Sequence, residues 1–221
     1  LIESVAVNVE GKPARQLFGF VTRNASSTGD RVTYDAVGRI VEYTVLGPDG
    51  KPVKSRPIEP KKLNDGDTPG PFDFRKGGFP GSVDSPSPSR YLFTYNEQGR
   101  VTQVEFLDGE GAPFALGGAS RIVVEFDERG NRTSLSYFDP DGRLGRPRQS
   151  VQRLLFPRLG SSDFPGMPYL GHLTGGNAPR TTFRYDERGN TTETAYFDED
   201  GKPAIINGGF AKKTSRYDDN G

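Results

Sequence analysis

The residue types that most often perform catalysis in proteins are sparse in this chain. It has a single histidine, His172, and no cysteine. A histidine could act as a general base, but catalytic triads and histidine metal sites need partner residues that a lone histidine lacks. We therefore interpret His172 as an ordinary loop residue. The lack of cysteine excludes disulfides, thiolate metal sites and cysteine nucleophiles.

Carboxylates are the remaining candidates for catalysis, because the chain has 29 acidic residues. A pair such as Glu193 and Asp198 could perform glycoside hydrolysis, which needs two carboxylates across a glycosidic bond. In a chain this rich in acids, however, such pairs can be chosen anywhere, and the pattern around Glu193 favours a solvated strand face. We predict no catalytic residue and interpret the chain as a protein that is not an enzyme.

Two acidic segments resemble the beginning of a calcium-binding loop. Residues 139–142 and 198–201 both have the pattern Asp-x-Asp-Gly. A complete loop needs further oxygen ligands and a distal glutamate at a set spacing, and neither segment is followed by them. Aspartate and glycine also make turns without any metal. We therefore predict turns with no metal or cofactor. Calcium remains an alternative if neighbouring repeats bring these acidic turns together.

Three Asn-x-Ser/Thr sequences could accept a glycan if the protein were secreted by a eukaryote. They begin at Asn24, Asn131 and Asn190. The last two directly follow a turn glycine and precede a predicted strand. Turn and strand preference therefore explains both of them without glycosylation.

Aromatic residues in two long Pro/Gly-rich segments are the best candidates for binding a partner. An exposed cluster of such rings could bind a protein or a glycan. The alternative is that the rings fold back and cover the sheet, because only 32% of the residues are hydrophobic and little else can form a core. The candidate residues are Phe72, Phe74, Phe79, Phe164 and Tyr169.

The elements that position these residues are indicated by a repeated phrase, aromatic-Asp-x-x-Gly. Repetition of a short phrase is typical of an array of small structural units. A fifth copy has asparagine in place of aspartate, at Asn96. The copies begin at Tyr34, Tyr95, Phe126, Tyr185 and Tyr217.

Residues 181–203 show what one copy predicts. Phe183 and Tyr185 alternate with polar residues, which is the period of a strand. Residues 186–189 then favour a turn, since the first aspartate can accept backbone hydrogen bonds and the final glycine can adopt positive φ. A second strand over 191–197 ends in another Asp-x-x-Gly turn. Each copy therefore predicts a β-hairpin.

The copies also follow a longer period. Their aromatic residues are separated by steps of 61, 31, 59 and 32 residues, so that two successive steps span about 91. The predicted organisation is a partial repeat over 1–33, a double repeat over 34–125 with a long loop at 51–90, a second double repeat over 126–216 with a long loop at 143–180, and the start of a further repeat at 217–221.

Composition agrees with an all-β protein. Glycine (29) and proline (18) are abundant, as expected for many short strands. With 29 basic and 29 acidic residues, the chain has no net charge to attract nucleic acid, and it has no apolar run long enough to span a membrane. We predict a repeat array of consecutive antiparallel β-hairpins, an extended or shell-like sheet, with stability arising between neighbours.

The Tyr-Asp-x-x-Gly phrases, each followed by a strand and a second Asp-x-x-Gly, resemble the tyrosine–aspartate (YD) repeats of rearrangement-hot-spot proteins and teneurins. In that family, successive β-hairpins wind into a large sheet or shell in secreted or surface-attached bacterial proteins, and such shells can enclose a toxin. The family's repeat is shorter than the steps of this chain, and the two long loops have no counterpart in it. No catalytic residues accompany the repeats.

Together these patterns predict a non-catalytic structural or interaction module of a larger bacterial protein, of which this chain is a fragment. The expected location is extracellular or in the cell envelope, and the expected partners are other protein subunits or further repeats of the same chain. One alternative is a shell segment of a toxin-delivery YD-repeat protein. Another is a carbohydrate-binding or carbohydrate-active β protein.

Overall fold

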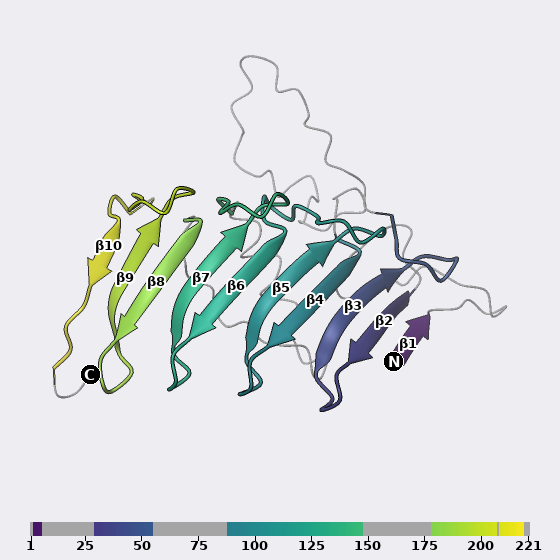
Figure 1. Cartoon of the computed structure of the whole chain (residues 1–221), viewed down its shortest axis with the longest axis horizontal. Coiled ribbons are helices and arrows are strands. Elements are labelled where there is room, and N and C mark those ends of the chain that lie inside the picture. The colour runs from purple at the N-terminus through teal and green to yellow at the C-terminus, as the bar shows by residue number, and fades with distance from the viewer. Residues whose placement is uncertain (1, 6–28, 55–87, 148–177, 207, 219–221) are drawn as a thin grey trace, which may run out of the picture.

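The chain folds into one open antiparallel sheet of ten strands that follow each other in chain order. The computed structural model describes residues 2–5, 29–54, 88–147, 178–206 and 208–218, and this part contains no helix. Figure 1 shows the strands side by side from β1 to β10. The predicted all-β array of consecutive antiparallel hairpins is confirmed. The strands are β1 (Ile2–Val5), β2 (Gly29–Tyr34), β3 (Ile40–Leu46), β4 (Arg90–Tyr95), β5 (Val101–Leu107), β6 (Arg121–Phe126), β7 (Arg132–Phe138), β8 (Arg180–Tyr185), β9 (Thr191–Phe197) and β10 (Lys212–Thr214).

Four hairpins share one register. In the hairpin of β8 and β9, Arg184 faces Glu193, but Tyr185 faces Thr191, so one residue of β9 is bulged out of the ladder. The same shift precedes the last aromatic residue of β2, β4 and β6. A bulge of this kind bends the strand and increases its twist. It also puts each repeat aromatic opposite the first residue of the following strand.

Aspartate and glycine make the turns as the sequence predicts. The Asp186 carboxylate accepts hydrogen bonds from the backbone N–H groups of Arg188 (3.0 Å) and Asn190 (2.8 Å). Gly189 closes this turn with φ of +86°, a conformation that glycine adopts without steric cost. At the opposite ends of the strands, Asp198 and Gly201 form a turn with the same hydrogen bonds and the same positive φ.

Pairing between hairpins is shorter than pairing within them. β7 and β8 pair over three residues, Ser134 to Ser136, whereas the ladder of β8 and β9 covers the whole of β8. One more backbone hydrogen bond lengthens the ladder wherever two hairpins meet. Between β7 and β8, the Tyr137 N–H donates to the Pro179 carbonyl (2.8 Å). The other donors of this set are the backbone N–H groups of Val45, Phe106 and Tyr196.

One face of the sheet carries the core. Its most deeply buried side chains include Phe106, Ile122, Leu135 and Tyr137. The aromatic rings meet edge to face, as Tyr91 does with Phe106 at 5.8 Å between ring centroids. Alternation along each strand puts every second side chain on this face, and the rows of neighbouring hairpins join into a single cluster.

The repeat aromatics are less buried than the residues that form the core. Tyr34, Tyr95, Phe126 and Tyr185 are only half-buried, at the margin of the core, and Tyr217 is 43% exposed. The reason is position, because Tyr34, Tyr95, Phe126 and Tyr185 each end a strand beside a turn. The residues earlier in these strands form the core, and no described strand lies beyond β10 to cover Tyr217.

The structure describes only the ends of the two predicted long loops. Arg90 and Arg180, the last residues of the predicted loops 51–90 and 143–180, are the first residues of β4 and β8. At the other end, the chain returns to its own strand, where the Val53 N–H donates to the Val45 carbonyl (3.0 Å). Residues 55–87 and 148–177 lie outside the described part of the chain. The repeat boundaries 1–33, 34–125, 126–216 and 217–221 remain predictions.

Candidate functional site

The junction between neighbouring hairpins is the best-defined polar feature of the structure. At three junctions, the hydroxyl of the repeat tyrosine donates a hydrogen bond to the preceding hairpin. Each acceptor is the backbone carbonyl of the first residue in the second strand of that hairpin. The pairs are Tyr95 with Ile40 (2.7 Å), Tyr185 with Arg132 (2.8 Å) and Tyr217 with Thr191 (2.9 Å). Phe126, at the remaining junction, lacks the hydroxyl.

The turns are also linked directly to each other. The third turn residue of one hairpin donates from its side chain to a backbone carbonyl in the next turn. The pairs are Gln98 with Glu128 (3.4 Å), Arg129 with Glu187 (2.9 Å) and Arg188 with Asp218 (2.9 Å). Val37 has this position in the first turn and has no polar side chain to donate. A row of side chain-to-backbone hydrogen bonds therefore links successive hairpins at one end of their strands.

The residue after each turn glycine differs between the two halves of the array. Arg39 lies with its guanidinium 4.8 Å from the ring centroid of Tyr95 in the next hairpin, and its Nε donates to Asp35 at 2.6 Å. Arg100 lies in the same way at 5.6 Å from the Phe126 ring. Such contacts between a cation and a ring are attractive, because the face of the ring is electronegative.

Asparagine has this position in the later hairpins. The Asn131 side-chain amide donates to its own turn aspartate, Asp127, at 3.0 Å. Asn190 does the same with Asp186, also at 3.0 Å. These bonds explain two of the Asn-x-Ser/Thr sequences as turn structure, in agreement with the sequence-based interpretation. Asn24 lies outside the described residues.

Hydrogen bonds favour the ionised forms of two turn carboxylates, Asp127 and Asp186. The side-chain and backbone N–H groups of Asn131 lower the pKa of Asp127. Burial would raise the pKa of Asp186, but hydrogen bonds from Asn190 and Arg188 outweigh it and lower this pKa. Burial has the opposite outcome for the junction tyrosines. It raises the pKa of Tyr95 to about 12, and it also raises the pKa of Tyr185.

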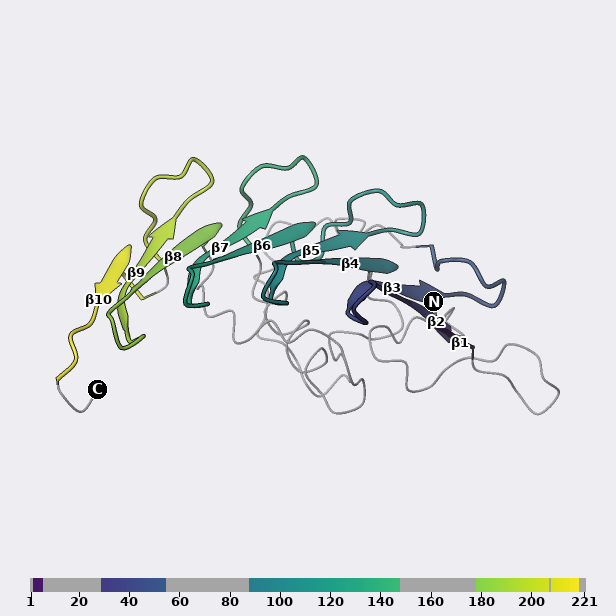
Figure 2. The ribbon, with the colours of Figure 1, turned by 60° about the horizontal axis from the view of Figure 1, so that its bottom comes forward.

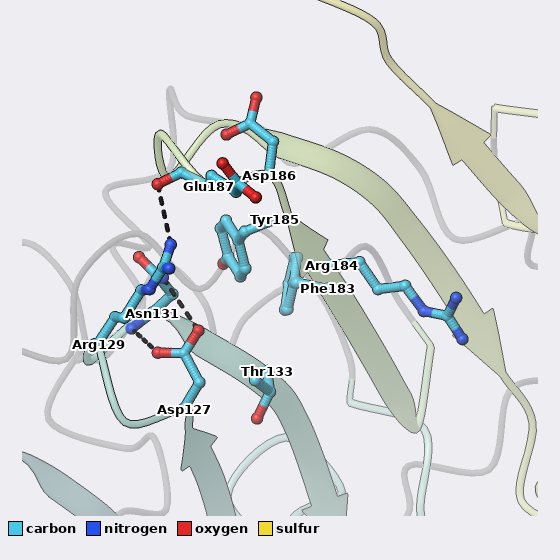
Figure 3. A pocket seen from close by; sticks show the side chains of 9 residues that line it. All are labelled: Asp127, Arg129, Asn131, Thr133, Phe183, Arg184, Tyr185, Asp186 and Glu187. Carbon is cyan, nitrogen blue, oxygen red and sulfur yellow. Dashed lines mark hydrogen bonds between the residues drawn. The ribbon is translucent and has the colours of Figure 1, made fainter.

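A groove of about 470 Å³ lies between the turns of β6–β7 and β8–β9. Figure 3 shows its side chains, with the Tyr185 ring between the two turns. Both carboxylates and aromatic rings are therefore presented to one space. The lining residues are Asp127, Arg129, Asn131, Thr133, Phe183, Arg184, Tyr185, Asp186 and Glu187.

Neither the available models of protein families nor the curated proteins match this chain. The functional interpretation therefore depends on the geometry of the hairpins, on the junctions between them and on this groove.

The two carboxylates considered for glycoside hydrolysis, Glu193 and Asp198, both interact with other groups of the sheet. Glu193 lies between two cations, Arg184 at 3.6 Å and Lys212 at 3.3 Å. Asp198 accepts the backbone bonds of its turn. Both carboxylates thus have structural partners, and the Glu193 side chain is only 22% exposed.

The two Asp-x-Asp-Gly turns also have ion pairs, each between the second aspartate and the basic residue after the turn glycine. The Asp141 carboxylate lies 3.9 Å from Arg143, and that of Asp200 lies 3.3 Å from Lys202. Among the described residues, no three histidine, cysteine or acidic side chains are grouped so that they could hold a metal ion. The described part also lacks a helix that could cross a membrane.

The loop aromatics proposed to bind a partner lie outside the described residues. This applies to Phe72, Phe74, Phe79, Phe164 and Tyr169, and also to His172. The groove at Tyr185 was missed by the sequence-based interpretation. A signal was nevertheless present, because the residue after the turn glycine changes from arginine to asparagine along the chain.

Proposed function

We propose that this chain is a non-catalytic structural and interaction module, built from hairpins that associate side by side, within a larger exported or envelope-associated bacterial protein of the YD-repeat type. The observation that carries this proposal is the tyrosine hydroxyl bond, which joins hairpins at three successive tyrosine copies with the same donor and acceptor positions. Arrays in which each unit contacts only its neighbours are typical of scaffolds and binding surfaces.

The edge at β10 supports association with further repeats or with a subunit that has the same hairpins. β10 is the last described strand; it is short and has two exposed lysines, Lys212 and Lys213, which limit non-specific pairing at this edge. An edge strand presents unpaired N–H and C=O groups to any further strand. Tyr217, directly after β10, already bonds to β9 in the way that Tyr185 bonds to β7. Further repeats, or a subunit with the same hairpins, would continue this pattern.

The location and the parent protein can be tested in the organism that encodes the chain. An antibody raised against the purified chain is used to probe the medium, the cell envelope and the cytoplasm, and intact cells are treated with an external protease. We expect a protein larger than 24.2 kDa in the medium or accessible to the protease. A protein found only in the cytoplasm, and protected from the protease, would contradict the proposal.

The shape of the sheet favours one alternative, a segment of a shell around a toxin domain. Figure 2 shows the strands following an arc, and only one face of the sheet carries the core cluster. Limited proteolysis of the parent protein distinguishes the two roles. A shell would protect an internal domain until the shell itself is cut, whereas a scaffold would leave its neighbouring domains open to cleavage. Carbohydrate binding stays a prediction that a glycan array would test.

A further inference from the structure

The groove at Tyr185 is equivalent to a place that arginine fills elsewhere in the same sheet. At the first junction, the Arg39 guanidinium covers the Tyr95 ring. At the second, Arg100 covers the Phe126 ring. At the third, the equivalent residue is Asn131, which turns back to Asp127 and leaves the groove beside the Tyr185 ring.

The contacts of the turn glycines confirm that these positions correspond. A Cβ built on Gly99 would lie 3.9 Å from the Arg39 guanidinium, and one built on Gly130 would overlap Arg100. A Cβ on Gly189 would likewise lie 3.9 Å from the equivalent side chain, at the Asn131 side-chain oxygen. The residue after each turn glycine therefore reaches the glycine of the next turn at all three junctions, and only the length and charge of its side chain differ.

We propose that this groove binds the guanidinium group of an arginine side chain from a partner polypeptide. The bound guanidinium lies on the Tyr185 ring, as Arg39 lies on Tyr95 within the chain. Planar guanidinium groups stack on aromatic rings and pair with carboxylates. The groove has residues of both kinds, since its lining includes Tyr185 and the acidic residues Asp127, Asp186 and Glu187. The Asp127 and Asp186 carboxylates also accept hydrogen bonds within their own turns. This binding does not require that the sheet belong to a longer array.

The two arginines of the groove do not take this place. The Arg184 guanidinium lies 3.6 Å from Glu193 on the polar face, and Figure 3 shows it extending away from Tyr185. Arg129 donates across the groove to the Glu187 carbonyl. Among the described residues, none has its cationic group over the Tyr185 ring, whereas Arg132 covers the neighbouring Phe183 ring at 4.8 Å. The three acidic and two basic residues of the lining leave one negative charge, which favours a further cation.

The test is an NMR titration of the full chain with the blocked pentapeptide Gly-Gly-Arg-Gly-Gly, with the same peptide carrying neutral citrulline in place of arginine, and with free L-arginine. We expect the backbone signals of Asn131, Glu187 and Arg188 to shift, with an affinity for the arginine peptide at least about threefold above that for the citrulline peptide. The first junction is an internal control. Signals of residues 96–99 should stay unchanged, because Arg39 already fills that place.

One substitution should abolish binding at the groove, and another should create a second binding groove. In Asn131→Arg the chain supplies its own guanidinium, so the shifts at Glu187 and Arg188 should disappear, whereas Asn131→Gln should retain them. In Arg39→Asn a new groove is expected at Tyr95, and the signals of residues 96–99 should then respond to the arginine peptide. This gain of binding keeps the proposal testable even if the Asn131→Arg chain does not fold.

Several results would overturn the proposal. One is equal binding of the arginine and citrulline peptides. Another is binding to Asn131→Arg as strong as to the unchanged chain. If Arg39→Asn folds but acquires no response at residues 96–99, the equivalence of the junctions is wrong. If free L-arginine binds and the pentapeptide does not, the partner is not a polypeptide.

Discussion

The Tyr95 hydroxyl donates a 2.7 Å hydrogen bond to the Ile40 backbone carbonyl, 55 residues earlier in the chain. This bond joins the second hairpin to the first, and it recurs from Tyr185 to Arg132. It gives a physical reason for tyrosine, rather than another large apolar residue, in the repeated phrase. The ring fills the margin of the core while the hydroxyl satisfies a carbonyl of the neighbouring hairpin.

Removal of this hydroxyl should destabilise the sheet. In Tyr185→Phe, the Arg132 carbonyl loses a half-buried partner, and we expect a loss of about 1 kcal/mol in the free energy of unfolding. In a chain of this length, such a loss lowers the melting temperature by about 2–4 °C. Urea unfolding followed by circular dichroism measures the difference. Tyr217→Phe is the matched control, and its more exposed bond should cost less. An equal or larger effect at Tyr217 would contradict the explanation.

Addition of the hydroxyl should have the reverse effect where it is missing. Phe126 has the repeat position at the one junction without this bond, and Arg100 already covers its ring. We expect Phe126→Tyr to leave the stability unchanged or to raise it by up to about 1 kcal/mol. The same urea measurement applies. A loss above about 1 kcal/mol would show that the second junction does not share the geometry of the others.

Acid should weaken the turns. Asp35, Asp127 and Asp186 have pKa values below the usual value because hydrogen bonds favour their ionised forms. The folded chain therefore binds fewer protons than the unfolded chain, so this stabilisation is complete above the unfolded pKa of about 4 and is lost as the pH falls further. Urea unfolding between neutral pH and about pH 2.5 should show this decline.

Asp186→Asn and Asp186→Ala separate the two roles of the turn carboxylate. Asparagine supports the same turn at Asn96, whose side-chain oxygen accepts the Arg100 N–H at 2.9 Å. Asp186→Asn should therefore keep most of the stability at pH 7 and reduce its decline in acid. Asp186→Ala should lower the melting temperature at every pH, because the backbone donors lose their acceptor. If asparagine and alanine behave alike, the side chain does not hold the turn.

Alkaline pH should act through Tyr95. Burial raises its pKa to about 12, above the value of about 10 for a free tyrosine. The folded chain retains this proton more firmly, so the contribution is complete below about pH 10 and is lost as the pH rises towards 12. A titration of phenolate absorbance should show one fewer late-ionising tyrosine in Tyr95→Phe than in the unchanged chain. If the tyrosine lost in Tyr95→Phe is one that ionises near pH 10, burial does not protect the Tyr95 hydroxyl.

Local chemistry made most of the fold predictable. The strand predicted over 191–197 agrees with β9, Thr191–Phe197, because alternation and turn glycines lie within short windows of sequence. In contrast, the half-burial of Tyr185 depends on a bulge and on a carbonyl in another hairpin. The groove at Asn131 depends on which side chain crosses a junction. Such relationships join residues more than 50 positions apart, so the change from arginine to asparagine after the turn glycine has a visible consequence only once the hairpins are paired.

Hydrogen exchange at the junctions tests most directly whether the hairpins form one continuous sheet. The backbone N–H groups of Val45, Phe106, Tyr137 and Tyr196 each donate to a carbonyl just before the first strand of the next hairpin or before β10. If the hairpins pair as described, these four amides should exchange more slowly than in the unfolded chain by a factor of about 10³ or more. Exchange at the rates of an unfolded chain, with protection limited to amides bonded within each hairpin, would contradict the account.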